Sequence, residues 1–346
     1  MEQEGSIEVV GVAADGNIAL MKVPLLHPDV VLLDVEMPNM DGLQCLAEIR
    51  RRWPKVKVVM FSTLTTRAAA ATLDALSLGA SDYVPKPQGL RDPAHGLAYV
   101  RDEVVPRILA LSPGAAAESA TEGLRPPAKR PGKTVAPRRR SHMSRVDVLA
   151  IGASTGGPKA LTNVLAGLPA SLPVPVVVVQ HMPPLFTRLL ADRLSAKTSL
   201  RVREAADGDL LAPGEVLVAP GDLHMVVEGS GHGPRVRTSF GPPENSCRPS
   251  VDPLFRSVAQ VFGPHTLGVV LTGMGRDGLR GSEAIRAAGG QILAQDEASS
   301  VVWGMPGFVA RAGLADGVVS ITDMARDVMS RVALRRAPVQ LAGSER

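Results

Sequence analysis

The chain has few cysteines and no long apolar run. Only Cys45 and Cys247 occur among its 346 residues, and they lie far apart in the sequence. Two such cysteines make neither a disulfide framework nor a metal cluster, so we interpret both as buried or incidental thiols. The longest apolar runs, such as the one around Val176–Val179, are much shorter than a membrane span, and we expect no membrane insertion.

A targeting signal is also missing. The first residues, Met1-Glu2-Gln3-Glu4, are acidic and lack the basic-then-apolar pattern of a signal peptide. Hydrophobic residues make up 45% of the chain and charged residues 21%, which is typical of a soluble globular protein. We therefore expect a cytoplasmic protein, long enough for two domains with sizeable cores.

The chain has little basic charge outside one segment. Residues 112–146 hold eight Lys or Arg against two Glu, a net +6; since the whole chain carries +4, the remainder carries −2. No nucleic-acid partner is therefore expected. Residues 112–144 are rich in Pro, Ala, Arg and Gly without apolar periodicity, which predicts a disordered or extended linker. It would join a first domain at residues 1–111 to a second at residues 145–340.

Short apolar strands alternate with helical patterns on both sides of this linker. In the first half we expect strands over Ile7–Val12, Val30–Leu33, Val56–Phe61 and Ser81–Val84, and helices over Asp15–Leu26, Gly42–Arg52 and Arg67–Leu78. In the second half we expect strands over Val146–Ile151, Val174–Val179, Val216–Ala219, Leu267–Leu271 and Gln291–Ala294, and helices from about Pro158 and over Gly281–Ala288. This alternation predicts α/β architecture: two doubly wound domains with parallel sheets, the second one larger.

Three polar residues end strands of the first half: Asp34, Ser62 and Lys86. Carboxyl ends of parallel strands meet at one edge of a sheet, so these side chains can share a pocket. There the carboxylate can attack a phosphoryl donor, and the hydroxyl and the ammonium can bind the phosphate oxygens. Each residue alone is weak evidence, because strand-end Asp and Ser often only cap loops.

The segments around these residues resemble a response-regulator receiver domain, which has a flavodoxin-like fold. They are Asp34-Val35-Glu36-Met37-Pro38 with Met40-Asp41-Gly42, Phe61-Ser62-Thr63-Leu64, and Asp82-Tyr83-Val84-Pro85-Lys86-Pro87. The resemblance implies that Asp34 is the phosphoacceptor, Ser62 the switch hydroxyl, Lys86 the phosphate-binding lysine and Tyr83 the aromatic switch residue.

The chain departs from the receiver pattern at its start. Receivers begin with a strand that ends in an acidic pair holding Mg²⁺, followed by a helix, whereas Ile7–Val12 matches the family's second strand. Phosphoryl transfer needs a cation to neutralise charge. We therefore expect an incomplete receiver with no metal site, in which phosphorylation of Asp34 is doubtful; either a mis-assigned start codon or a degraded domain accounts for this.

The second half contains a candidate nucleophile. Gly152-Ala153-Ser154-Thr155-Gly156-Gly157-Pro158 follows an apolar strand, opens a helix and fits the G-x-S-x-G nucleophile elbow. Small neighbours expose the serine hydroxyl, and the helix N-terminus favours developing negative charge. A phosphate-binding glycine loop is the competing interpretation, but that motif normally needs G-x-G-x-x-G, and Ala153-Ser154 breaks it.

Candidates for a base and an orienting acid also follow predicted strands. His181 comes directly after a strong buried strand, at the same sheet edge as Ser154, and is the best candidate base. Asp277, in a glycine-rich loop after another buried strand, is the candidate acid, although it could be only a helix N-cap; Asp296 is the runner-up. This Ser…His…Asp order differs from the common α/β-hydrolase order.

The second half resembles the catalytic domain of the chemotaxis protein-glutamate methylesterase family, a Rossmann-like fold. The matching segments are Ile151–Pro158, Gln180-His181-Met182, Pro220-Gly221-Asp222 with His224, Pro249-Ser250-Val251-Asp252, Leu271–Gly278, Ala294-Gln295-Asp296-Glu297 and Gly304-Met305-Pro306. The resemblance implies that Ser154 is the nucleophile, His181 the base and Asp277 the orienting acid. It also implies that the backbone N–H of Met274, with support from Thr155, stabilises the oxyanion.

The resemblance further implies the substrates and partners. These are γ-methyl glutamyl esters, and glutamines, on methyl-accepting chemoreceptors, with a chemotaxis histidine kinase as phosphodonor. The hydrolysis needs no cofactor, whereas receiver phosphorylation in the family uses Mg²⁺. The family's receiver packs over the active site, and for an incomplete receiver we expect weak inhibition and near-constitutive activity.

Three other functions stay open at this point. The chain could be a catalytically silent response regulator that acts by binding, which a large separation of Ser154 and His181 would favour. It could be a nucleotide-binding α/β protein that uses the glycine loop for phosphate. A DNA-binding regulator is the weakest alternative, because no helix-turn-helix pattern follows the receiver-like half.

Overall fold

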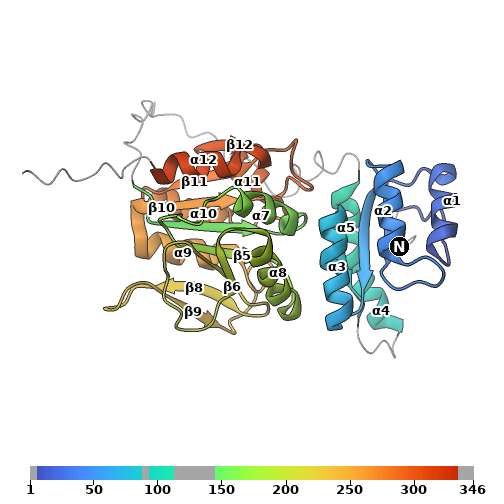
Figure 1. Cartoon of the computed structure of the whole chain (residues 1–346), viewed down its shortest axis with the longest axis horizontal. Coiled ribbons are helices and arrows are strands. Elements are labelled where there is room, and N and C mark those ends of the chain that lie inside the picture. Colours follow the sequence, from blue (N-terminus) through green and yellow to red (C-terminus); the bar gives the residue numbers. More distant parts are fainter. Residues whose placement is uncertain (1–5, 88–92, 113–144, 334–346) are drawn as a thin grey trace, which may run out of the picture.

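The structure is a computed structural model that describes residues 6–87, 93–112 and 145–333 (Figure 1). The described residues form two units, each built on a parallel sheet. Nearly all of the predicted linker lies outside the described residues, so the domain limits at 111, 144 and 340 stay predictions. None of the described helices is long and apolar enough to cross a membrane.

The first unit is a three-stranded parallel sheet covered by helices. Its strands are β1 (Val30–Asp34), β2 (Lys57–Ser62) and β3 (Asp82–Pro85), in that order across the sheet. Its helices are α1 (Gly16–Leu26), α2 (Gly42–Arg52), α3 (Thr66–Leu78), α4 (Pro93–Tyr99) and α5 (Val105–Leu111), with one π-helical turn (Val100–Val104) before α5. The register pairs Asp34 with Phe61 and Ser62 with Pro85, so the predicted polar residues reach the same edge of the sheet.

The predicted strand over Ile7–Val12 is wrong. These residues form irregular chain without strand pairing, and Val12 is 76% exposed. Flavodoxin-like sheets have the order 2-1-3-4-5, in which the first strand separates the second from the third. A segment that matches the second strand therefore has no neighbour to pair with among the described residues. As a result β1 lies at an edge of the sheet, and only Leu33 in it is fully buried.

The second unit is built on a seven-stranded parallel sheet with the order β12-β11-β10-β4-β5-β7-β6. These strands are β4 (Val148–Ala153), β5 (Val176–Gln180), β6 (Arg201–Glu204), β7 (Glu215–Val218), β10 (Thr266–Val270), β11 (Gln291–Gln295) and β12 (Gly317–Val319). The central strands β4, β5 and β10 are buried along their whole length, as expected for a sheet covered on both faces.

Helices cover both faces of this sheet. On one face lie α7 (Gly157–Ala166), α8 (Pro184–Lys197) and α12 (Ile321–Ala333); on the other lie α9 (Val251–Phe262), α10 (Leu279–Ala287) and α11 (Met305–Arg311), together with an antiparallel hairpin of β8 (His224–Glu228) and β9 (Arg235–Ser239). Alternate residues of β4 enter the two cores: Leu149 and Ile151 pack on the first face, and Val148 and Ala150 on the second. The predicted fold class, α/β with two doubly wound parallel sheets, is confirmed.

The two units pack against each other through α3, which contacts α7 and α8 (Figure 1). The Tyr83 ring stacks on the Phe186 ring of α8, with centroids 4.6 Å apart. Further along α8, Arg193 Nη1 forms an ion pair with Asp74 Oδ1 of α3 at 2.6 Å. The first unit therefore covers the helices that follow β4 and β5, the two strands that carry the candidate nucleophile and base.

Candidate active site

Ser154 lies on a tight turn between β4 and α7, as predicted. Gly156 in this turn has φ 78°, a left-handed conformation that favours glycine. Gly157 has no room for a side chain, since a Cβ there would lie 1.9 Å from Gln180 Oε1. These glycines allow the chain to turn sharply from strand to helix, and Ser154 remains half-buried at the turn.

His181 follows the neighbouring strand at the matching position. Ala153 pairs with Gln180 in the β4–β5 register, so Ser154 and His181 are each the first residue beyond the paired strand ends. The His181 N–H donates to Ala153 O at 3.2 Å, and Gln180 Nε2 donates to Ser154 O at 3.0 Å. The sheet thus brings the candidate nucleophile and base together.

Asp277 lies in the loop before α10 and forms a hydrogen bond with His181. Its Oδ2 lies 2.8 Å from His181 Nε2. The carboxylate also accepts hydrogen bonds at the N-terminus of α9: Oδ2 from the Val251 N–H, and Oδ1 from the Asp252 N–H and from Ser250 Oγ. A helix N-terminus stabilises negative charge, so the fold holds Asp277 ionised and oriented toward the imidazole.

Charge and hydrogen bonding shift the pKa values of this pair. Burial raises the pKa of Asp277, but the hydrogen bond from His181 and those from the α9 N-terminus outweigh it, so the pKa lies below its ordinary value. Burial lowers the pKa of His181, but the charge of Cys247 and the hydrogen bonds with Asp277 and Cys247 outweigh it and raise the pKa to about 10. The surroundings of His181 therefore favour the imidazolium.

The second ring nitrogen of His181 faces a cysteine. Cys247 Sγ lies 3.5 Å from His181 Nδ1, and no hydrogen bond joins Ser154 Oγ to His181 in the described part of the chain. Hydrogen bonds between catalytic groups often become short only when substrate is bound. Cys247 was interpreted from the sequence as buried or incidental. The structure instead places its thiol within hydrogen-bonding distance of the candidate base, His181.

An oxyanion site can form beside Ser154. The Ser154 N–H donates to Thr272 O at 3.0 Å, and a Cβ on Gly273 would lie 2.7 Å from Ser154 Cβ, so this loop passes directly against the serine. Within the described residues, the backbone N–H groups of Met274 and Thr155 make no hydrogen bond. Both are therefore available to an oxygen that develops negative charge near Ser154.

Asp296, the alternative acid, does not reach the site. Its Oδ1 accepts hydrogen bonds from the Ser299 N–H at 3.0 Å and from Ser299 Oγ, which closes a local turn after β11. The structure thus brings Asp277, and not Asp296, to His181.

Sequence reasoning named Ser250 and Asp252 only as part of a matching segment and missed Asn245, and these three residues hold the acid in place. Asn245 Nδ2 donates to both Asp277 Oδ1 and Asp252 Oδ2 at 2.9 Å. Asp252 is buried, and Ser250 donates to Asp277 as described above. The segment before α9 has no apolar period, so no pattern in the sequence marks Asn245 as a neighbour of Asp277.

The predicted phosphate site of the first unit is partly assembled. Lys86 Nζ lies 2.5 Å from Asp34 Oδ2, as an ion pair at the edge of the sheet. The Ser62 hydroxyl is fully buried and donates to Ala68 O at 3.3 Å, within α3. Tyr83 is turned toward the second unit, where it stacks on Phe186.

The residues around Asp34 do not make a Mg²⁺ site. Asp34 Oδ2 is paired with Lys86, and Oδ1 accepts the Glu36 N–H at 3.1 Å. Across residues 6–87, 93–112 and 145–333, no cluster of three or more His, Cys, Asp or Glu side chains could hold a metal ion. Mg²⁺ favours several oxygen ligands, and the described donor set offers a single carboxylate that is already paired with a cation.

Known proteins match the chain over most of its length. The CheB methylesterase family matches residues 149–328, and the response regulator receiver domain family matches residues 1–94. The chain is 47% identical to a protein-glutamate methylesterase/protein-glutamine glutaminase of Trichodesmium erythraeum, over 94% of this chain and 92% of the relative. It is also 47% identical to a protein of the same name from a Nocardioides species, over 99% of this chain and 93% of the relative.

A solved structure agrees with these relatives. The catalytic domain of Thermotoga maritima CheB methylesterase is 37% identical, with a TM-score of 0.53, and the match covers 56% of this chain and 100% of that domain. The elbow at Ser154, the His181–Asp277 pair and the seven-stranded sheet all lie within the matched catalytic family. The chain therefore belongs to the CheB methylesterase family and carries a response-regulator receiver domain ahead of its catalytic domain.

Proposed function

We propose that this chain hydrolyses γ-methyl esters of glutamate side chains, and deamidates glutamines, on methyl-accepting chemoreceptors. The names of its relatives support this activity. The observation that carries the proposal is the 2.8 Å hydrogen bond between His181 and Asp277. His181 and the elbow serine, Ser154, are the first residues beyond the paired ends of two neighbouring strands. A serine beside an oriented imidazole is the arrangement that acyl transfer requires.

In the proposed reaction, Ser154 Oγ attacks the ester carbonyl while His181 takes its proton. Because Nε2 is bound to Asp277, Nδ1 is the nitrogen available to accept that proton, at the position that now faces Cys247. The backbone N–H groups of Met274 and Thr155 would stabilise the oxyanion. The imidazolium then protonates the leaving methanol, and water attacks the acyl-enzyme to release glutamate.

Deamidation needs the same groups. A glutamine amide would be attacked at the same carbonyl, and ammonia would leave in place of methanol. The step requires no cofactor, because the nucleophile, base and oxyanion donors all come from the chain. The reaction would take place in the cytoplasm, on the cytoplasmic helices of the receptors.

The receiver would regulate this site. A chemotaxis histidine kinase is the expected phosphodonor, with Asp34 as the acceptor and Lys86 and Ser62 as the phosphate-sensing groups, but transfer onto Asp34 needs a cation to neutralise charge. The packing of Tyr83 on Phe186 supports a receiver that restricts access to the catalytic domain. Since the described residues around Asp34 do not form a Mg²⁺ site, we expect a small-molecule phosphodonor to change the rate little; a large increase that is lost in Asp34→Asn would contradict this expectation.

The proposal is tested by mass spectrometry of methylated receptor fragments after incubation with the chain. Ester loss and deamidation should both occur, and both should disappear in Ser154→Ala while its thermal unfolding stays that of the wild type. Ester cleavage by Ser154→Ala above the level of His181→Ala would contradict the assignment. A folded wild-type chain without any turnover would favour a catalytically silent regulator.

A further inference from the structure

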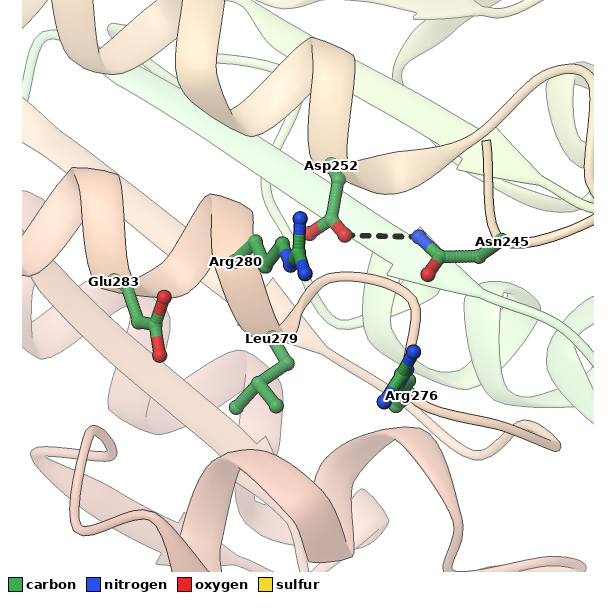
Figure 2. A pocket seen from close by; sticks show the side chains of 6 residues that line it. All are labelled: Asn245, Asp252, Arg276, Leu279, Arg280 and Glu283. Atoms are coloured by element: carbon green, nitrogen blue, oxygen red, sulfur yellow. Dashed lines mark hydrogen bonds between the residues drawn. The ribbon is translucent and has the colours of Figure 1, made fainter. Parts of the chain in front are cut away.

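A pocket of about 530 Å³ lies beside the candidate acid, on α9, α10 and the loops before them. Figure 2 shows the side chains that line it, which are Asn245, Asp252, Arg276, Leu279, Arg280 and Glu283. Asn245 connects the pocket to the active site, because its Nδ2 donates to Asp277 Oδ1 and to Asp252 Oδ2. The pocket therefore adjoins the catalytic residues without containing them.

Two arginines of this pocket have no partner. Arg276 and Arg280 are exposed, and neither guanidinium makes a hydrogen bond or an ion pair with any residue of the described chain. Other arginines of the same domain are paired, such as Arg256 with Glu244 at 2.6 Å and Arg286 with Asp316 at 2.6 Å. Arg276 and Arg280 thus bring two unpaired guanidiniums to the same pocket.

No ion pair joins the acidic residues of the pocket to these arginines in the described part of the chain. Asp252 Oδ1 accepts the Gly281 N–H at 2.7 Å, and Oδ2 accepts Asn245 Nδ2 at 2.9 Å, so its carboxylate is held toward the backbone of α10 and toward Asn245. Glu283 lies at the opposite end of the pocket from Asn245 in Figure 2. The space between Asn245 and Glu283 therefore presents guanidinium donors to solvent.

We propose that Arg276 and Arg280 form a carboxylate-binding subsite that receives an acidic side chain of the receptor next to the reacting ester. This inference rests on the proposed function. Guanidinium groups bind carboxylates through paired N–H donors, and they carry their charge at every physiological pH. The subsite would make the enzyme prefer esters that have an acidic neighbour.

We expect the receptor segment that carries the ester to be helical. The helix then sets the sequence spacing between the ester and an acidic residue that the subsite can bind. On a helix, residues three or four positions apart lie about 5–6 Å from each other, and residues seven apart lie about 10 Å apart on the same face. The proposed subsite would read an acidic residue at one of these positions while the ester is at Ser154. Acidic residues at other spacings point away from this face.

The experiment compares two helical peptides, each with one glutamate methyl ester. One peptide carries glutamates three, four and seven positions from the ester on either side, and the other carries glutamines there. For each enzyme, the ratio of kcat/KM for the first peptide to that for the second is measured from methanol release. The enzymes are the wild type, the double variant Arg276→Gln/Arg280→Gln, and Arg326→Gln on α12 as a charge-matched control.

The inference predicts a ratio of about fivefold in the wild type and in the control, as expected for solvent-exposed ion pairs. In the double variant the ratio should fall to about one, and added salt should lower the wild-type ratio in the same direction. A wild-type ratio of one, or a ratio that persists in the double variant, would overturn the subsite and leave the esterase intact. Turnover of neither peptide by folded wild type would overturn the proposed function, and with it this inference.

Discussion

Asp82 of the receiver accepts a hydrogen bond from the hydroxyl of Thr155, the residue that follows the candidate nucleophile, at 2.6 Å. Both side chains are buried. Burial raises the pKa of Asp82, against the opposing charge of Arg107, which lies 3.6 Å away. The receiver thus contacts the elbow turn itself, one residue from Ser154, through a buried polar pair.

Breaking this pair should activate the enzyme. We expect Asp82→Ala to raise the rate of ester hydrolysis by up to about tenfold, since a typical intramolecular hydrogen bond contributes about 0.5–1.5 kcal/mol. Initial rates of methanol release measure the effect. Arg193→Ala, which breaks a separate contact between the two units, should act in the same direction. Asp29→Ala, an exposed carboxylate elsewhere on the receiver, serves as the control. An unchanged rate in both interface variants would show that the packed receiver does not restrict the site.

Cys247 should set the pH dependence of the reaction. A base must be neutral to accept the serine proton, so a His181 pKa of about 10 places the rise of kcat/KM in the alkaline range. The charge of Cys247 is one cause of that raised pKa, and Cys247→Ser removes it. We expect the rising limb of the pH–rate profile to move to lower pH in Cys247→Ser.

A matched variant separates this effect from a general loss of structure. Cys45 lies in the core of the receiver, away from His181, and Cys45→Ser should leave the rising limb in place. If Cys247→Ser lowers kcat without moving the limb, the thiol only fills space beside the imidazole.

The two candidate acids can be distinguished directly. Asp277→Asn replaces a carboxylate that accepts bonds from His181, Ser250 and the α9 N-terminus by an amide that cannot accept them all. We expect kcat to fall by about 10⁴-fold, as for the loss of an orienting acid in other triads. Asp296→Asn, which disturbs only a local turn, should keep most of the activity. A larger loss in Asp296→Asn than in Asp277→Asn would reverse the assignment.

The residues at strand ends could be predicted from the sequence because their positions follow from a local pattern. Ser154, His181 and Asp277 each follow a buried parallel strand, and such strands end at one edge of the sheet. The same reasoning predicted that Asp34 and Lys86 lie close together, and in the structure they form an ion pair.

The residues that were missed depend on contacts between distant segments. Cys247 and Asn245 lie in irregular chain before α9, where no period indicates which way a side chain points. Asp82 resembles an ordinary strand-start carboxylate until the second unit buries it against Thr155. The strand expected over Ile7–Val12 has a suitable composition, but a strand needs a paired neighbour, and composition does not supply one.

Release of methanol from methylated chemoreceptor fragments, measured with the purified wild type beside Ser154→Ala, tests the central claim most directly. The account predicts steady release by the wild type and none by Ser154→Ala, with the same fold in both. Release by both proteins, or by neither while both are folded, would contradict the assignment of Ser154 as the nucleophile of a methylesterase.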